Sequence, residues 1–507
     1  QLIKENGYET MASLLRQFDV SDVNRIRMCG EFFCNLSHNS EIGQKLLNRR
    51  VVEVLLHCAK CLDDDVVFAC RVARSMVTLS AGIKSTEMVV WQKGLQFVVD
   101  LSSQHGIILA SAYQILFNIV CSSKTKVLPW FRECASVATK VYVKQIDRPL
   151  DMQQLLLSVL CHLATFAPLS SAMIGFDIIG KLENHLEGII ANKKYLFHSE
   201  RIDLVERIAL LFYNMSRHID SASKMADENI LHHIRSMLSF IEHHSEQCTQ
   251  LLLAIIGNVG RSPHGRTIII SNGAVNILRN SSLDGVAAMK KSITDGNSTA
   301  ESFRLVDLFQ DRLRICVEGL LHLSSDEKVV REITCQGALR VLIVVCNMTK
   351  DWELLYMSIC TVCDLLSTHF VMEIHSVVPQ DIEDSIDLLF EIHRKVIEQN
   401  KEYLGYMATA LRNVTMFPAL LGYIAGKNLP VAEIAVSLAY ESYPQEDIME
   451  MFSGALYHSS TNTVTERPLC SKEYIKKIID VMKIAKTPRI DELCLATIQN
   501  VTHAFSS

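Results

Sequence analysis

The sequence predicts an all-α protein built from repeated helical units. Proline (10) and glycine (21) are scarce among its 507 residues. Apolar residues recur at three- and four-residue spacing nearly throughout, which is typical of amphipathic helices. A short phrase also returns along the chain, as in "FFCNLSHNS" from Phe32, "LFYNMSRH" from Leu211 and "LRNVTMF" from Leu411. A repeat array with one continuous core explains this length without three separate domains.

Aligning the phrase on the Asn of "NLS" defines one position per unit, called the marker here. The markers are Asn35, Thr78, Asn118, His162, Asn214, Asn258, His322, Asp364, Asn413, His458 and Asn500. Eight of the ten intervals between successive markers lie between 40 and 49 residues, and the longest is 64. This spacing is close to the period of helical repeats of the armadillo and HEAT kinds.

Each unit has the same internal order. A long helix such as "DVVFACRVARSMVTLS" carries apolar residues at helical spacing and ends near its marker. A short polar turn and a short helix follow, and then a small residue or glycine opens another helix, as at Gly94, Gly273 and Gly337. Glycine suits a sharp bend between helices, which a residue with a Cβ would resist.

This rhythm resembles the armadillo repeat, and the resemblance covers essentially the whole chain in about eleven units. HEAT repeats are the nearest alternative, but the three-helix unit with a Gly-Ala opening favours armadillo. The resemblance implies a right-handed armadillo-repeat superhelix, an α-α solenoid. We expect a single solenoid over 1–507, in which each unit packs only on its neighbours. The Ser-, Gly- and Lys-rich segment at about 280–302 is expected to be an inserted flexible loop, and the chain, which opens on Gln1, to be part of a longer one.

Composition excludes several classes of function. The net charge of −6 is small and spread along the chain, so we expect no nucleic-acid partner. The apolar window at 154–176 is long enough for a membrane span, but His162, Pro168 and its serines favour a buried helix pair. Sixteen cysteines in a helical chain indicate a reducing compartment, so we expect a cytoplasmic protein.

Motifs for catalysis or metal binding are weak, so we expect no enzyme, no cofactor and no metal. The N-x-S/T matches fall in the last turn of helices, where glycosylation is not expected. The pairs Cys58/Cys61 and Cys360/Cys363 lie some 300 residues apart and are not expected to meet at one zinc ion. His243, His244 and Cys248 have helical spacing, but an exposed helix end explains them. "GYIAGKN" at 422–428 is one residue short of a phosphate-binding loop.

The candidate binding residues are the asparagines at marker positions. The armadillo resemblance implies a concave groove in which such amides clamp the main chain of an extended peptide. The matching residues are Asn35, Asn118, Asn214, Asn258, Asn413 and Asn500. Alternatively, these amides satisfy carbonyl groups at helix ends. Nuclear-import receptors of this fold carry a Trp four residues earlier, but here that position holds Glu31, Gln114, Leu210, Ala254, Thr409 and Ala496.

One helical segment, from Cys470, places lysines beside an Ile/Met face. Lys472, Lys476, Lys483 and Lys486 are candidates for contact with an acidic partner such as a tubulin tail, or form an ordinary solvated face. The sequence therefore predicts a non-enzymatic protein-binding scaffold or adaptor, in one version part of a cytoskeletal or ciliary assembly that contacts tubulin or coiled coils. Two alternatives stay open. The stretch at 316–346 is similar to UNC-45-type myosin chaperones, and the chain could be the regulatory armadillo domain of an enzyme.

Overall fold

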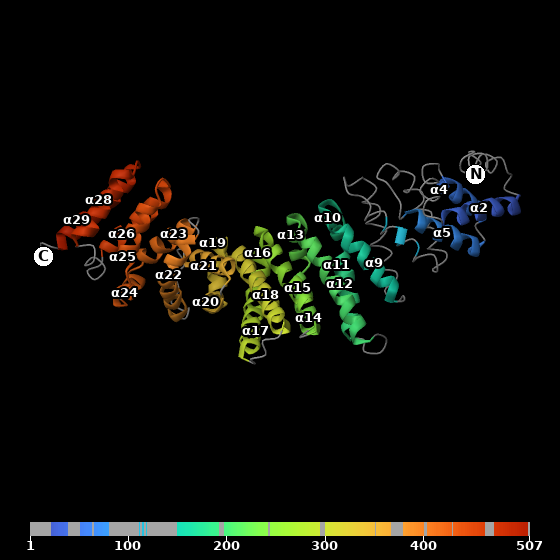
Figure 1. The fold of residues 1–507 in the computed structure, drawn as a ribbon, viewed down its shortest axis with the longest axis horizontal. Helices are drawn as coiled ribbons and strands as arrows, with labels where there is room; N and C mark the ends of the chain where they lie inside the picture. Colours follow the sequence, from blue (N-terminus) through green and yellow to red (C-terminus); the bar gives the residue numbers. More distant parts are fainter. Residues whose placement is uncertain are drawn as a thin grey trace. The chain divides into compact units, whose positions relative to one another are not determined.

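The computed structural model describes the helical elements of most of the chain. The described residues are 22–38, 51–62, 65–80, 150–191, 197–241, 244–294, 300–349, 351–366, 379–399, 403–427, 429–461 and 471–504, together with 111, 114, 115 and 118. Within these ranges every regular element is a helix (Figure 1). The all-α prediction is therefore confirmed for the described part of the chain. The predicted opening at Gly94 lies outside it.

The helices follow the three-part order predicted from the repeats. Helices that end beside a marker, called marker helices here, are α2 (Val23–Ser37), α5 (Val66–Ser80), α9 (Leu150–Leu163), α12 (His198–Ser216), α15 (Glu246–Gly260), α18 (Ala300–Ser324), α21 (Trp352–Leu366), α23 (Tyr403–Met416), α26 (Glu446–Ser460) and α29 (Pro488–Ala504). Short helices follow five of them: α10 (Ala167–Gly175), α13 (Ile219–Asp227), α16 (Pro263–Ser271), α19 (Glu327–Cys335) and α24 (Pro418–Gly426). The remaining helices come before marker helices: α4 (Val51–Cys61), α11 (Ile178–Ala191), α14 (Ile230–Ile241), α17 (Ala274–Thr294), α20 (Ala338–Met348), α22 (Pro379–Gln399), α25 (Val431–Glu441) and α28 (Lys472–Ile484).

The contacts within the chain divide it into two compact units. Unit 1 comprises 1–228 and 239–248, and unit 2 comprises 229–238 and 249–507. In unit 2, α18, α21, α23, α26 and α29 each pack on the next of the series. In unit 1, α2 packs on α5 and α9 packs on α12. Each unit is thus built by stacking equivalent marker helices, as a repeat protein requires.

The bend between the short helix and the helix after it has one backbone conformation in four described repeats. Gly273 and Gly337 have φ values of +84° and +83° at this bend, as the sequence predicted. Two earlier repeats use Asp177 (φ 59°) and Asn229 (φ 54°) at the same place. Asn and Asp are the residues with a side chain that tolerate the left-handed region best. The backbone conformation at this bend is therefore the same in these repeats, although the residue type differs.

The core is formed by apolar faces between successive helices, and two close approaches need glycine. A Cβ on Gly30 of α2 would lie 2.3 Å from the ring of Phe68 in α5. A Cβ on Gly257 of α15 would lie 3.2 Å from the Cα of Gly319 in α18. Gly30 thus leaves room for an aromatic ring, whereas Gly257 and Gly319 let two marker helices cross with their backbones nearly in contact.

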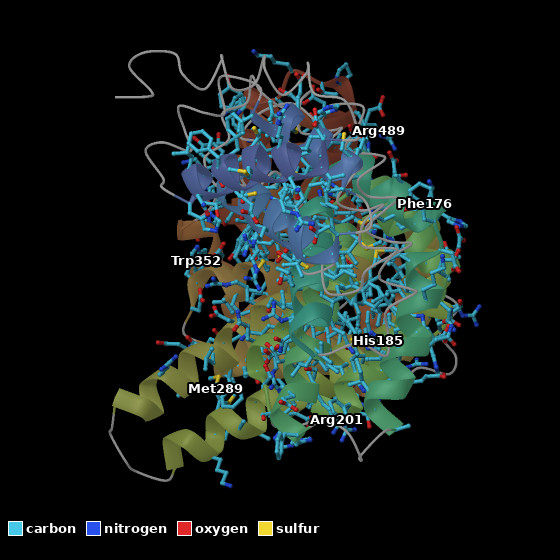
Figure 2. All side chains as sticks on the ribbon, turned by 90° about the vertical axis from the view of Figure 1, so that its right-hand side faces the viewer. Phe176, His185, Arg201, Met289, Trp352 and Arg489 are labelled. Atoms are coloured by element: carbon cyan, nitrogen blue, oxygen red, sulfur yellow. The ribbon has the colours of Figure 1, made fainter. Side chains whose placement is uncertain are left out.

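The prediction of a flexible loop at about 280–302 is wrong over most of that range. Helix α17 runs through Thr294 and α18 begins at Ala300, which leaves only 295–299 outside the described residues. The two helices pack side by side, and Figure 2 labels Met289 on α17. Val286 and Met289 are only 4% and 3% exposed. The segment is mostly polar, but its few apolar residues form a narrow stripe that packs on α18. The 64-residue interval between the markers Asn258 and His322 therefore reflects two lengthened helices.

Candidate partner-binding face

The marker helices of unit 2 present a repeated surface. Residues seven and four positions before a marker lie on nearly the same side of a helix as the marker itself. Because successive marker helices from α15 to α29 pack on one another, these three positions form three rows across them. The rows together are called the marker face here.

The three rows differ in chemistry. Seven positions before the markers, every residue of unit 2 is apolar and at least partly exposed: Leu251, Ile315, Met357, Tyr406, Met451 and Leu493. Four positions before the markers, most residues are small: Ala254, Glu318, Cys360, Thr409, Gly454 and Ala496. The markers themselves are polar: Asn258, His322, Asp364, Asn413, His458 and Asn500. An apolar row therefore runs beside a row of hydrogen-bonding side chains.

Several marker amides contact the end of the preceding marker helix. Asn118 donates through Nδ2 to Ser80 Oγ at 2.9 Å and to the Val77 carbonyl at 3.3 Å. Asn500 donates to Ser460 Oγ at 3.0 Å. In α12, Asn214 is 8% exposed and donates to the carbonyl of Cys161 at 2.9 Å. These three asparagines thus satisfy groups at the ends of neighbouring helices, which is the alternative role that the sequence left open.

The hydroxyl two residues after the marker completes this arrangement. Ser80, Ser324 and Ser460 each donate to the carbonyl three residues earlier, at 2.7, 3.0 and 2.6 Å. A serine hydroxyl has one hydrogen, so its oxygen can still accept from the next marker. The hydroxyl two residues after these three markers is therefore a link between repeats: it closes one helix end and contacts the following marker side chain.

Asp364 replaces the amide of this link by a carboxyl group. It is half-buried and hydrogen-bonds Ser324, and burial raises its pKa to about 6 although the Ser324 contact opposes the shift. Protonated Asp364 can donate to Ser324 Oγ as an amide would. Ionised Asp364 can only accept, and it then competes with the Leu321 carbonyl for the single Ser324 hydrogen.

Eight residues before the marker, a second polar side chain reaches forward to the following marker helix. Arg27 pairs with Asp65 at 2.5 Å, and Gln154 donates to Asp203 at 2.6 Å. Gln250 donates to the carbonyl of Leu308 at 2.9 Å. Arg314 donates to Asp351 at 2.6 Å. Four marker helices, α2, α9, α15 and α18, are therefore tied forward by this residue, whereas α12 and α29 are tied backward by their markers.

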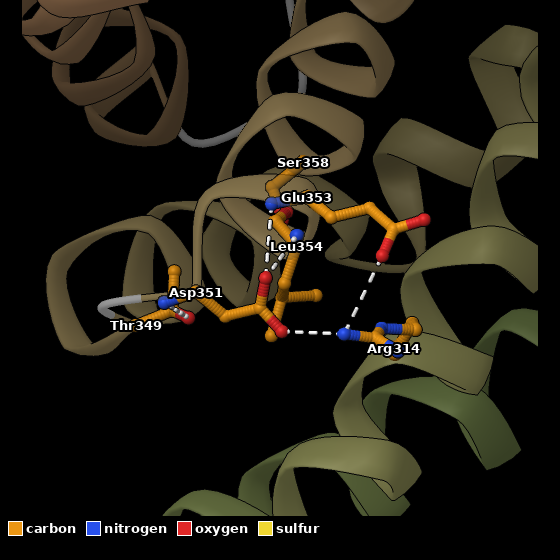
Figure 3. A network of polar contacts seen from close by, with 6 residues as sticks. All are labelled: Arg314, Thr349, Asp351, Glu353, Leu354 and Ser358. Carbon is orange, nitrogen blue, oxygen red and sulfur yellow. Dashed lines mark hydrogen bonds and ion pairs between the residues drawn. The ribbon is translucent and has the colours of Figure 1, made fainter.

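Figure 3 shows the most extensive of these forward ties. Asp351 precedes α21, and its Oδ1 accepts from the backbone N–H groups of Glu353 (2.9 Å) and Leu354 (3.3 Å). Its Oδ2 accepts from Arg314, which also lies 3.5 Å from Glu353. Burial alone would raise the pKa of Asp351, but the hydrogen bonds from Arg314 and Leu354 lower it overall. A helix cap and an ion pair therefore share one carboxylate.

The other predicted binding residues lie in different settings. Asn35 is exposed at the end of α2, and Asn258 and Asn413 are half-buried on the marker face. Among the candidate lysines, Lys472, Lys476 and Lys483 lie on one exposed face of α28, where Lys483 pairs with Asp480 at 2.9 Å. Lys486 lies in the turn after α28, so the structure does not place it on the same helical face. The predicted roles of these residues stay predictions.

Sequence reasoning missed both the forward ties and the role of the Ser. The signal for the first was an Arg or Gln at a fixed offset, eight residues before the marker, in Arg27, Gln154, Gln250 and Arg314. The signal for the second was a serine two residues after the marker, in Ser80, Ser324 and Ser460. Neither partner could be named from the sequence, because each lies about 40 to 60 residues away in the neighbouring repeat.

The residues considered for metal or redox chemistry are mainly buried. Cys58, Cys360 and Cys363 are 0–3% exposed, and burial raises the pKa of the Cys58 thiol to about 12. Within the described ranges, no group of three or more His, Cys, Asp or Glu side chains is arranged to hold a metal ion. The same part of the chain contains no helix with the length and apolar character to cross a bilayer.

Comparison with known proteins identifies the fold. No family model and no curated protein matches the sequence. Among solved structures, a chain from work on a phosphorylation switch in the interaction between cadherin and beta-catenin is 11% identical, with a TM-score of 0.59 over 97% of this chain and 96% of that one. An engineered protein is 12% identical, with a TM-score of 0.50 over 97% and 98%. UNC-45 from Drosophila melanogaster is 13% identical, with a TM-score of 0.47 over 99% and 70%.

Identities at this level establish the fold alone. The chain has the fold of armadillo-type helical-repeat solenoids, as its repeats predicted.

Proposed function

We propose that the chain is a non-enzymatic protein-binding scaffold, and that the marker face of unit 2 holds an extended segment of a partner polypeptide. The observation that carries this proposal is the row of partly exposed apolar side chains on six successive marker helices. Tyr406, in the middle of the row, is 39% exposed. Apolar groups that recur on one face of a folded protein favour association with another protein.

The neighbouring rows support an extended ligand. Small residues such as Ala254 and Thr409 leave room beside the apolar row, where a ligand backbone can approach. The polar markers next to them offer amide and imidazole groups, which can pair with the main chain of a strand-like peptide. The row of tryptophans that would accept lysine stems is missing, so the proposed ligand presents apolar side chains.

A peptide-display selection on the full chain tests this proposal. Random peptides that bind the wild-type chain are then measured by fluorescence polarisation against a variant that combines Tyr406→Ser with Met451→Ser. The matched control combines Phe197→Ser with Ile219→Ser, which removes apolar side chains that are 78% and 57% exposed in unit 1. We expect affinity to fall about tenfold or more in the face variant, as for loss of interface anchors, and to stay unchanged in the control.

Two outcomes would contradict the proposal. Enriched peptides that bind the face variant as tightly as the wild type would place the binding surface elsewhere. A selection that yields only strongly basic peptides would contradict the apolar ligand.

The three narrower assignments rest on different grounds. A cytoskeletal or ciliary partner rests on analogy between folds. The UNC-45-type chaperone role rests on the sequence likeness at 316–346, and a regulatory role beside an enzyme domain rests on fold analogy as well. Identification of the partner from native tissue or cells would separate these three roles.

A further inference from the structure

Two histidines from separate repeats meet on the surface of unit 1. His198 begins α12, and His244 lies in the turn that precedes α15, 46 residues later. Their Nε2 atoms lie 3.1 Å apart, and the ring centroids are 4.5 Å apart with the rings nearly perpendicular. Both side chains are exposed. The two imidazoles therefore share a hydrogen bond through Nε2, in which one nitrogen donates and the other accepts, and a metal ion that bound both would replace the shared proton.

The surroundings hold the pair in place. The edge of the His198 ring contacts Phe240 of α14, with centroids 5.8 Å apart. The guanidinium of Arg201, labelled in Figure 2, stacks over the same Phe240 ring at 4.8 Å. Arg201 is itself fixed, because it is only 6% exposed and its Nε donates to the Ile189 carbonyl at 2.7 Å. The Arg201 guanidinium thus binds a carbonyl group at the end of α11. The Phe240 ring, in turn, supports the His198 ring.

The distance between the two Nε2 atoms matches that between two imidazole nitrogens bound to one metal ion. Imidazole nitrogens bind Zn²⁺ at about 2.0–2.1 Å, so two of them at tetrahedral or octahedral angles lie roughly 2.9–3.4 Å apart. The observed 3.1 Å falls inside this interval without any movement of the chain. We propose that His198 and His244 together bind a divalent transition-metal ion of the class that prefers imidazole, such as Zn²⁺ or Ni²⁺.

The site would be an open one. Cys248, which the sequence grouped with His243 and His244, is 1% exposed, and burial together with Glu206 raises its pKa to about 12. It therefore stays a protonated core residue and adds no ligand. His243 lies outside the described residues. Since the described residues supply no third protein ligand, water or a group from a partner completes the coordination.

Metal binding would have a structural consequence. The ion would join the start of α12 to the turn before α15, two segments that the chain connects only through 46 residues. A ligand that binds only the folded state raises the free energy of unfolding. The bound ion would therefore stabilise this edge of unit 1.

Titration of the full chain with Ni²⁺ near neutral pH tests the proposal. Ni²⁺ is the better probe because the many cysteines of the chain compete more strongly for zinc. Isothermal titration calorimetry compares the wild type with His198→Gln, His244→Gln and the double variant. His232→Gln, at an exposed histidine on α14 outside the pair, is the matched control.

We expect the wild type and the control to bind equally. Each single variant should lose about tenfold or more in affinity. Loss of a group that only orients a metal ligand already costs about tenfold, and loss of a ligand should cost at least as much. The double variant should lose less than the sum of the two single losses, because both residues serve one site. Saturating Ni²⁺ should raise the melting temperature of the wild type and control only.

Equal affinity of the wild type and the double variant would overturn the proposal, as would no saturable binding to the wild type. Circular dichroism of each variant shows whether it is folded before titration.

Discussion

Arg279 of α17 donates through Nη1 to the carbonyl of Gln336 at 2.9 Å, immediately before the left-handed Gly337 of the next repeat. Arg235, at the corresponding place in α14, donates to the carbonyl of Asn272 before Gly273. A Cβ on Gly273 would lie 2.9 Å from Nη2 of Arg235. The glycine thus serves two purposes, since it adopts the positive φ and leaves room for the arginine of the preceding repeat.

Gly273→Ala should therefore destabilise the chain. A left-handed residue with a Cβ costs about 1–2 kcal/mol, and the Arg235 guanidinium, at the free end of a flexible side chain, would have to shift. The matched control is Gly422→Ala in α24, where a Cβ meets nothing within 4 Å and the backbone is helical. This control should gain about 0.5–1 kcal/mol. Urea denaturation measures both, and an unchanged midpoint for Gly273→Ala would contradict the packing described here.

Asp364→Asn should stabilise the chain near neutral pH. The pKa of Asp364 is raised to about 6 in the fold, so between the unfolded value of about 3.9 and this value the folded state binds more protons than the unfolded state. Stability conferred by this residue is therefore greatest below pH 4 and falls as pH rises to about 6. An amide removes the charge and can still donate to Ser324.

Urea denaturation at a series of pH values measures this effect. The gain near neutral pH should be on the order of 2–3 kcal/mol, given a pKa raised by about two units at about 1.4 kcal/mol each, and should vanish in acid. Ser324→Ala is the companion variant, because it removes the hydrogen-bond partner in both proteins. An equal effect of Asp364→Asn at all pH values would contradict the titration of this residue.

Asp351→Ala should lose both a helix cap and an ion pair. We expect a cost of about 1–2 kcal/mol, the usual range for an N-cap, whereas Glu353→Ala at the exposed rim of the same network should cost little. Because the pKa of Asp351 is lowered in the fold, its contribution is present above the unfolded pKa and is lost as pH falls through the folded value. A double-mutant cycle with Arg314→Ala would give the coupling energy, and a value of zero would contradict the network in Figure 3.

Asn214→Ala should lower stability even without a partner. Its amide satisfies the Cys161 carbonyl, one of the last carbonyls of α9, which have no partner inside the helix. Loss of a buried hydrogen bond that strands its acceptor costs about 1–3 kcal/mol. Asn35→Ala is the control, because Asn35 is an exposed marker. Similar melting temperatures for the two variants would favour a ligand-binding role for Asn214 instead.

Amide exchange in α17 should be slow at Val286 and Met289, which are buried against α18. Met289→Ala should cost about 2–5 kcal/mol, as for other buried apolar residues cut to alanine. Lys290→Ala, at an exposed neighbour, is the control and should change little. Fast exchange through this segment in the wild type would restore the mobile loop that the sequence predicted.

The repeat could be predicted because its signals are local. The period of markers, the helical spacing of apolar residues and the glycines at 273 and 337 each act within one unit, and the fold confirms them. The segment at 280–302 was predicted to be a loop because it is rich in Ser, Gly and Lys. Its few apolar residues, which α18 buries, were a weaker signal. Asp177 and Asn229 at the same bend were also missed, since a left-handed conformation is not readable from Asp or Asn alone.

The sequence by itself determined the class of fold, the order of helices within a repeat and the recurrence of the marker. Only the tertiary structure decided what the markers and the forward ties contact: Asn214 meets Cys161, Asn500 meets Ser460, and Arg314 meets Asp351. The physical reason is that helix formation depends on neighbours three or four residues away, whereas each of these contacts joins two repeats and exists only after the helices have packed.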